Sequence, residues 1–182
     1  MVVGGRLWVH FAHNVRSERP ITNNLRPITH KNKPMNLPEY ENIRIRKTQD
    51  GKHEVLDILR QRFVTLTPEE WVRQHFVNFL IHHRGYPAAL MANEVELTVG
   101  GKRLRCDSVL FDKERKPRTI MEYKAESVTL TDKVLTQIAT YNMLLHVEYL
   151  VVSNGNTHLC LHYNHDRAKW EFMPDIPQYK DL

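Results

Sequence analysis

Residues 94–125, EVELTVGGKRLRCDSVLFDKERKPRTIMEYKA, decide the fold of this chain. Apolar and polar residues alternate in this stretch, which is typical of strands that bury one face. A Gly-Gly pair and a charged turn rich in Asp, Lys and Pro interrupt the alternation, as hairpin connections do. We therefore predict an antiparallel meander of three strands, at residues 94–99, 104–111 and 119–125.

A helix is predicted on each side of the meander. Thr67 is a typical N-cap, Pro68 suits the first helical position, and Glu70 stands at the capping-box spacing, with Gly85 as the stop. A second helix is predicted over residues 132–146. Further strands follow at 148–153 and 157–163, with 170–172 extending the sheet and 174–182 as a surface strap. This order predicts an α/β fold, with a mixed central sheet that contains an antiparallel meander and is flanked by helices.

The residues before the first strong helix have weaker patterns. Alternation over 43–46, followed by a turn at 49–52, predicts a short strand. The apolar residues of 54–63 recur at helical spacing, so we expect a short helix there. These residues are Val55, Leu56, Ile58, Leu59 and Phe63.

Composition indicates one compact domain rather than a disordered, disulfide-rich or membrane-spanning chain. The chain has 182 residues, of which 41% are hydrophobic, and only two cysteines. No apolar run approaches the roughly 18 residues of a membrane span. The sequence shows no secretory signal, so we expect a cytoplasmic protein.

The net charge of +5 comes from the first 34 residues. They carry six basic side chains and one acidic one, and Pro and Asn interrupt any regular pattern. We predict a disordered basic N-terminal extension at 1–34 and a folded domain at 35–182, with Met35 as the biological start.

The meander brings together three side chains that suit metal-assisted chemistry. Asp107 lies in the second predicted strand, and Glu122 and Lys124 lie in the third. If the strands pair about a turn near 114–115, Asp107 falls opposite Glu122, and alternation places Glu122 and Lys124 on one face. Converging carboxylates suit Mg²⁺ or Mn²⁺. The alternative is a solvated face with weak cross-strand ion pairs.

Helical residues add further candidates, each with an ordinary alternative. Gln137 and Tyr141 stand four apart and share one edge of the second helix, but Tyr141 also fits its apolar stripe. Glu70 also serves as the capping-box glutamate. Residues 102–118 hold seven basic and three acidic side chains, which suit phosphate contact or a solvated face equally well.

These pieces together resemble a known family. The set comprises PEEWVRQ at 68–74, Glu94, RCD at 105–107, EYK at 122–124, QxxxY at 137–141 and SNG at 153–155. In order and spacing it is similar to the N-terminal nuclease domain of type I restriction enzyme restriction subunits. That family belongs to the PD-(D/E)XK superfamily of restriction-endonuclease-like folds. The resemblance covers about residues 36–175.

The resemblance implies Mg²⁺-dependent hydrolysis of phosphodiester bonds in DNA. Asp107 and Glu122 would bind the metal, and Lys124 would position or activate the attacking water. Glu70 or its neighbour Glu69 would complete the metal shell, directly or through water. Gln137 and Tyr141 would lie beside the active site and contact nucleic acid or orient the catalytic lysine. Arg73 and Arg105 are further residues assigned to nucleic-acid contact. Implied partners are DNA and restriction-modification subunits or a separate motor protein.

The sequence departs from the family pattern in two ways. Cys106 replaces the usual proline before the first aspartate, and no GxxxxGK phosphate-binding loop is present, so the chain alone cannot drive ATP-dependent translocation. The leading hypothesis is a metal-dependent deoxyribonuclease. One alternative is a catalytically inactive nucleic-acid-binding or assembly module with the same fold, and another is a metal-free structural domain.

Overall fold

The computed structural model describes residues 35–38, 43–99, 101–131, 134 and 147–182. Within these residues the chain forms two β-sheets and three helices. The strands are β1 (Ile45–Lys47), β2 (His53–Asp57), β3 (Arg62–Thr65), β4 (Met91–Val99), β5 (Lys102–Phe111), β6 (Pro117–Tyr123), β7 (Tyr149–Ser153), β8 (His158–Asn164) and β9 (Lys169–Phe172). The helices are α1 (Pro68–His83) and the short 3₁₀ helices η1 (Ala88–Leu90) and η2 (Tyr179–Asp181).

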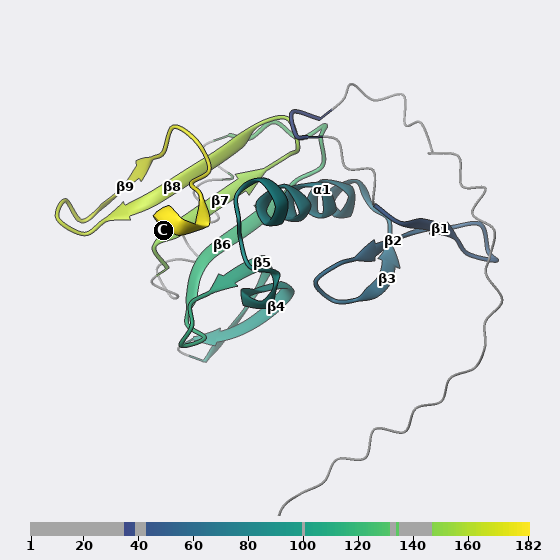
Figure 1. Cartoon of the computed structure of the whole chain (residues 1–182), viewed down its shortest axis with the longest axis horizontal. Coiled ribbons are helices and arrows are strands. Elements are labelled where there is room, and N and C mark those ends of the chain that lie inside the picture. The colour runs from purple at the N-terminus through teal and green to yellow at the C-terminus, as the bar shows by residue number, and fades with distance from the viewer. Residues whose placement is uncertain (1–34, 39–42, 100, 132–133, 135–146) are drawn as a thin grey trace, which may run out of the picture. The chain divides into compact units, whose positions relative to one another are not determined.

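The larger sheet has the strand order β4-β5-β6-β7-β8-β9 (Figure 1). The β6–β7 pair is parallel and the other pairs are antiparallel. The predicted meander and the mixed character of the sheet are therefore confirmed. All five residues of β7 are buried, as expected for a central strand that is covered on both faces.

The register of the meander is the one predicted from the turn near residues 114–115. Ser108 pairs with Met121 on β6, and Val95 pairs with Cys106 between β4 and β5. Extending these registers by one residue places Glu94, Asp107 and Glu122 in a row across three neighbouring strands.

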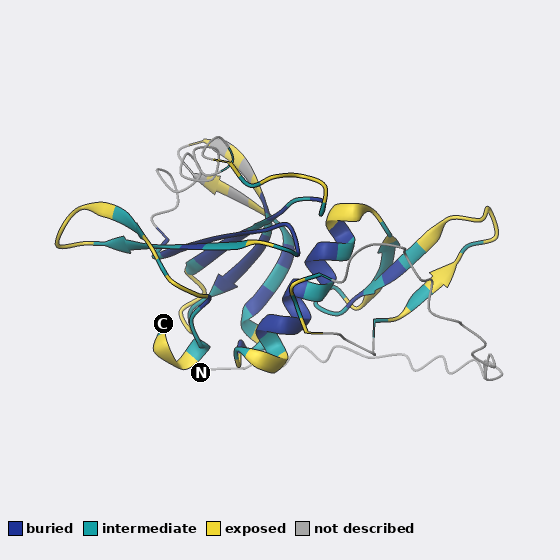
Figure 2. Cartoon of the chain, turned by 90° about the horizontal axis from the view of Figure 1, so that it is seen from above, coloured by how far each residue is buried: buried dark blue, intermediate teal, exposed yellow. Residues whose placement is uncertain are grey.

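Helix α1 lies against one face of this sheet (Figure 1). As predicted, Thr67 caps its N-terminus: the hydroxyl of Thr67 accepts a hydrogen bond of 3.1 Å from the Glu70 amide. Gly85, just beyond the helix, has φ +71°, a conformation that glycine adopts without steric cost. Burial is concentrated in α1 and in the central strands of the sheet (Figure 2). The core under α1 includes Val72, Phe76, Val77, Leu80, Leu110, Met121, Tyr123, Val151, Cys160 and Ile176.

The opposite face of the sheet has its own apolar core. Its buried members come from β5, β6 and β7, together with Val147 just before β7. Leu130 and Val134 pack against them. The buried members are Cys106, Val109, Ile120, Val147, Leu150 and Val152. Side chains on β6 therefore alternate between two distinct cores.

The helix predicted over 54–63 is wrong, because this segment forms the β2–β3 hairpin. The Asp57 carboxylate accepts hydrogen bonds of 2.9 Å from the amides of Leu59 and Arg60, which closes a turn where a helix would continue. Gln61 follows with φ 52°. The three strands β1-β2-β3 make a separate antiparallel sheet, so the described residues contain two sheets and not the single predicted one.

Some predicted features fall outside the described residues. These are the extension 1–34 and the helix over 132–146 apart from Val134, so Gln137 and Tyr141 are among them. The predicted C-terminal strap is described: Ile176 is buried in the core under α1, and the Tyr179 amide donates a hydrogen bond of 2.9 Å to the Arg84 carbonyl.

Candidate functional site

Helix α1 buries a polar ridge beside its apolar stripe. Glu70, Arg73 and Gln74 are all buried, and their spacing of three and four residues places them together. Glu70 Oε2 accepts a hydrogen bond of 2.8 Å from Arg73 Nη1, and Glu70 Oε1 accepts one of 2.7 Å from Gln74 Nε2. The Glu70 carboxylate is thus directed at Arg73 and Gln74 on its own helix.

Arg73 joins α1 to the sheet. Its Nη1 lies 2.6 Å from Glu94 Oε1, and its Nη2 lies 3.1 Å from Asp107 Oδ1, so one guanidinium contacts three carboxylates. Only 5% of the Arg73 side chain is exposed, and the guanidinium lies 5.8 Å from the centre of the Tyr123 ring. Burial alone would lower the pKa of Arg73, but the charges of Glu70, Asp107 and Glu94 outweigh burial and raise it. Arg73 therefore stays positively charged.

The backbone of β4 changes its alternation at Glu94. Asn93 hydrogen-bonds to Asp57, Val95 packs into the core opposite α1, and Glu94 between them adopts φ 55°. This left-handed residue directs the Glu94 carboxylate to Arg73, and the carboxylate also pairs with Arg105. Burial would raise the pKa of Glu94, but its bonds to these two arginines lower it. In the sequence Glu94 belongs only to the family-like pattern, which predicts no role for it.

Asp107 lies where the β5–β6 hydrogen-bonding ladder stops. The last pair of that ladder is Ser108 with Met121, and beyond it Asp107 Oδ2 accepts a hydrogen bond of 2.8 Å from the Tyr123 amide. The other oxygen, Oδ1, contacts Arg73. The carboxylate is thus held from two sides, next to the peptide that joins Glu122 to Tyr123.

Glu122 and Lys124 form an ion pair of 2.8 Å between Oε1 and Nζ, as their predicted shared face requires. Met121 and Tyr123 belong to the core under α1, so alternation directs Glu122 to the opposite face of the sheet. Burial and the negative charge of Asp107 raise the pKa of Glu122, and the ammonium group of Lys124 only partly offsets them. Two carboxylates therefore repel each other beside one lysine.

The structure brings some of the predicted residues together and separates others. Asp107, Glu122 and Lys124 are neighbours, whereas Glu70 lies on the α1 side behind Arg73. Nucleic-acid contact by Arg73 finds no support, because the side chain is buried and occupied by carboxylates. Arg105 remains a candidate for such contact, since 69% of its side chain is exposed.

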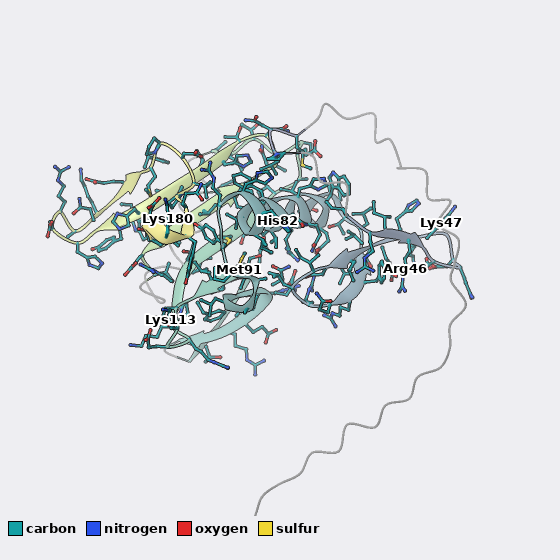
Figure 3. The ribbon with its side chains drawn as sticks, viewed as in Figure 1. Arg46, Lys47, His82, Met91, Lys113 and Lys180 are labelled. Carbon is teal, nitrogen blue, oxygen red and sulfur yellow. The ribbon has the colours of Figure 1, made fainter. Side chains whose placement is uncertain are left out.

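Other basic side chains are spread over several elements. Arg46 and Lys47 lie on β1, Lys113 lies in the turn between β5 and β6, and Lys180 lies in η2 (Figure 3). These residues provide controls for substitutions within the site.

The donor chemistry of the site fits one hard divalent cation. Among the described residues no group of three or more His, Cys, Asp or Glu side chains forms a metal-binding cluster. Mg²⁺ commonly uses only one or two carboxylates and keeps several waters, so Asp107 and Glu122 together are a sufficient protein contribution. Lys124 lies beside them, with its ammonium group 2.8 Å from Glu122 Oε1.

Comparisons with known proteins find a family match and similar solved structures. A family model described as type I restriction enzyme R protein N terminus (HSDR_N) matches residues 68–177. A solved fragment described as an HsdR subunit of a type I restriction enzyme from Vibrio vulnificus YJ016 is 18% identical, with a TM-score of 0.48. That match covers 64% of this chain and 24% of the fragment. A DrdV–DNA complex is 19% identical over 60% of this chain and 11% of DrdV, with a TM-score of 0.37.

The match to these solved structures spans a quarter or less of their chains. No curated protein matches the sequence. Within the described part of the chain, no helix has the length and apolar character needed to cross a membrane.

Proposed function

Because the chain belongs to the family of type I restriction enzyme R protein N termini, we propose that it is a metal-dependent deoxyribonuclease domain. The single observation that carries this proposal is the fixed arrangement of Asp107 beside the Glu122–Lys124 ion pair. The helix, the antiparallel meander and the following parallel strand are consistent with a restriction-endonuclease-like fold.

Asp107 and Glu122 are the residues that would hold Mg²⁺ or Mn²⁺. Such an ion, when bound, lowers the pKa of a coordinated water and neutralises charge on a phosphodiester. The chain contributes the geometry: the Tyr123 amide and Arg73 hold the Asp107 carboxylate, so its orientation does not depend on the metal.

Lys124 would orient the attacking water and stabilise negative charge that develops on the phosphate. Its backbone is fixed, because the Lys124 amide donates a hydrogen bond of 2.9 Å to the Ser153 carbonyl at the end of β7. Its side chain is 23% exposed, so the ammonium group is reachable from solvent while it remains paired with Glu122. DNA is the proposed substrate, and other restriction-modification subunits or a separate motor protein are the proposed partners.

Cleavage of supercoiled plasmid in Mg²⁺ tests the proposal. Wild type should nick the plasmid, and Asp107→Asn and Lys124→Ala should each lower the rate by about 100-fold or more. Lys113→Ala is the matched control, because it removes an exposed lysine from the β5–β6 turn and should leave the rate unchanged. Circular dichroism of each variant establishes that the fold is retained.

The competing function is a binding or assembly module without turnover. Wild type that binds DNA but leaves the plasmid intact in both Mg²⁺ and Mn²⁺ would establish that alternative and contradict the nuclease proposal.

A further inference from the structure

The α1 side of the site already contains a cation that belongs to the protein. The Arg73 guanidinium lies 2.6 to 3.1 Å from oxygens of Glu94, Glu70 and Asp107. At such distances these carboxylates contact both terminal nitrogens of the guanidinium, which neutralises part of their charge, while the buried Nε of Arg73 has no hydrogen-bond partner among the described residues. A metal ion on this side would have to displace Arg73 or lie against it, and the two positive charges would repel.

Glu70 has less capacity left for a metal than Asp107, whose two oxygens accept one hydrogen bond each and whose side chain is 22% exposed. Both oxygens of Glu70 accept hydrogen bonds, one from Gln74 and the other from Arg73, and Arg60 Nη2 approaches the second oxygen at 3.4 Å. The Glu70 side chain is only 8% exposed, and it lies on the α1 side of the sheet. Glu122 lies on the opposite face, so Glu70 and Glu122 do not face one another.

Asp107 connects the two sides. Its Oδ1 faces Arg73, and its Oδ2 lies at the β6 backbone next to Glu122. The row of carboxylates is thus divided at Asp107, with a fixed organic cation on one side and the Glu122–Lys124 pair on the other.

We propose that Arg73 acts as a built-in cation that restricts this site to a single divalent ion, which Asp107 and Glu122 bind, while Glu70 binds Arg73 and not the metal. This inference rests on the proposed function and makes it more specific. Arg73 is then a positioning residue, because it orients Asp107 without touching DNA or the attacking water.

The proposal predicts that removing the guanidinium creates a second metal site. Arg73→Ala leaves Glu70, Glu94 and Asp107 around an emptied volume with unbalanced negative charge, and a divalent ion relieves such repulsion. Arg73→Lys keeps one positive charge there, so a second ion should still be excluded.

The test measures how many Mn²⁺ ions the full chain binds, by calorimetric titration and by electron paramagnetic resonance of unbound Mn²⁺. Wild type and Arg73→Lys should bind one ion, and Arg73→Ala should bind two. Ca²⁺ should raise the melting temperature of Arg73→Ala by more than it raises that of wild type. Arg84→Gln, which removes a guanidinium paired with Asp175 outside the site, should leave the stoichiometry at one.

Two amide variants test which carboxylates bind the metal and which bind Arg73, even if Arg73→Ala fails to fold. Glu122→Gln should abolish measurable Mn²⁺ binding, and Glu70→Gln should weaken it by no more than about tenfold, the lower end of outer-sphere effects. Two ions in wild type, one ion in folded Arg73→Ala, or loss of binding in Glu70→Gln would each overturn the inference.

The same titration separates this inference from the proposed function. Wild type that binds one ion but cleaves no DNA would contradict the nuclease proposal and leave the role of Arg73 standing. Wild type that binds no ion would contradict both.

Discussion

Asp57→Asn should be one of the most destabilising conservative substitutions in the chain. Asp57 is fully buried at the end of β2, and its carboxylate accepts four hydrogen bonds. Oδ1 accepts hydrogen bonds from the amides of Leu59 and Arg60, and Oδ2 accepts them from Arg60 Nε and Asn93 Nδ2. These bonds close the β2–β3 turn and join the smaller sheet to β4.

The cost follows from which bonds the amide preserves. The side-chain oxygen of asparagine can still accept hydrogen bonds from the two backbone amides. Its NH₂ group, however, would face two donors, Arg60 Nε and Asn93 Nδ2, and could accept from neither. A hydrogen bond that involves a charged group contributes about 1.5–3 kcal/mol, so the loss of two predicts about 3–6 kcal/mol. That range agrees with the roughly 3–5 kcal/mol lost when one partner of a buried ion pair is removed. It is a large part of the total of about 5–15 kcal/mol expected for a folded domain.

Urea unfolding followed by tryptophan fluorescence measures this cost as a difference in free energy of unfolding. Asp50→Asn is the matched control, because Asp50 is exposed and pairs with Lys52 at the surface, so its loss should be undetectable. A change below about 1 kcal/mol for Asp57→Asn would refute the reasoning.

The pH dependence gives a second check on Asp57. Burial alone would raise its pKa, but the bonds from Asn93 and Arg60 outweigh burial and lower the pKa below 3.8. The stabilisation by the carboxylate is therefore complete above the unfolded-state pKa, and it is lost as the pH falls through the lower folded-state pKa. The difference between wild type and Asp57→Asn should persist down to about pH 4 and shrink below it.

Three further predictions concern other parts of the fold. Without metal, Glu122→Gln should raise the free energy of unfolding at neutral pH, because the raised folded-state pKa of Glu122 means that its ionised carboxylate destabilises the fold. This gain in stability should vanish as the pH falls through that pKa toward 4.5. Gly155→Ala should cost about 1–2 kcal/mol for its φ of +84°, and more because its Cβ would lie 2.6 Å from Met35 Sδ. Burial raises the pKa of Cys106 to about 11 and that of Cys160 to about 12, so neither thiol should react with Ellman's reagent until the protein unfolds.

Each of these predictions has a control and a result that would contradict it. A lower stability of Glu122→Gln at neutral pH would show that the Lys124 pair outweighs burial and repulsion. In a Met35→Ala background the cost of Gly155→Ala should decrease, and an unchanged cost would mean that the Met35 contact is irrelevant. Rapid labelling of either thiol in folded protein, judged against urea-unfolded protein, would contradict its burial.

Local sequence signals predicted α1 and the meander well. Thr67, Pro68 and Gly85 mark helix ends through local backbone chemistry, and the turn near residues 114–115 fixes the register that brings Asp107 opposite Glu122. Such features depend on a few neighbouring residues, so the sequence contains them directly.

The structural features that the sequence did not predict depend on contacts with residues distant in sequence or on an unusual backbone conformation. The apolar spacing of 54–63 fits a helix. The Asp57 carboxylate, however, accepts hydrogen bonds from the Leu59 amide and from the Asn93 side chain, and hydrophobic periodicity carries no information about such bonds. Strict alternation also breaks at Glu94, whose left-handed backbone directs its carboxylate to Arg73 on α1. The burial of Arg73 follows from that long-range contact, which its position on the helix does not reveal, and its assignment to nucleic-acid contact stays a prediction.

The most direct test of the account is a crystal grown with Mn²⁺ and measured at the manganese absorption edge. We predict one anomalous peak per chain, within bonding distance of carboxylate oxygens of both Asp107 and Glu122, with Arg73 still in contact with Glu70. A peak bound by Glu70, or the absence of any peak beside Asp107 and Glu122, would contradict the account.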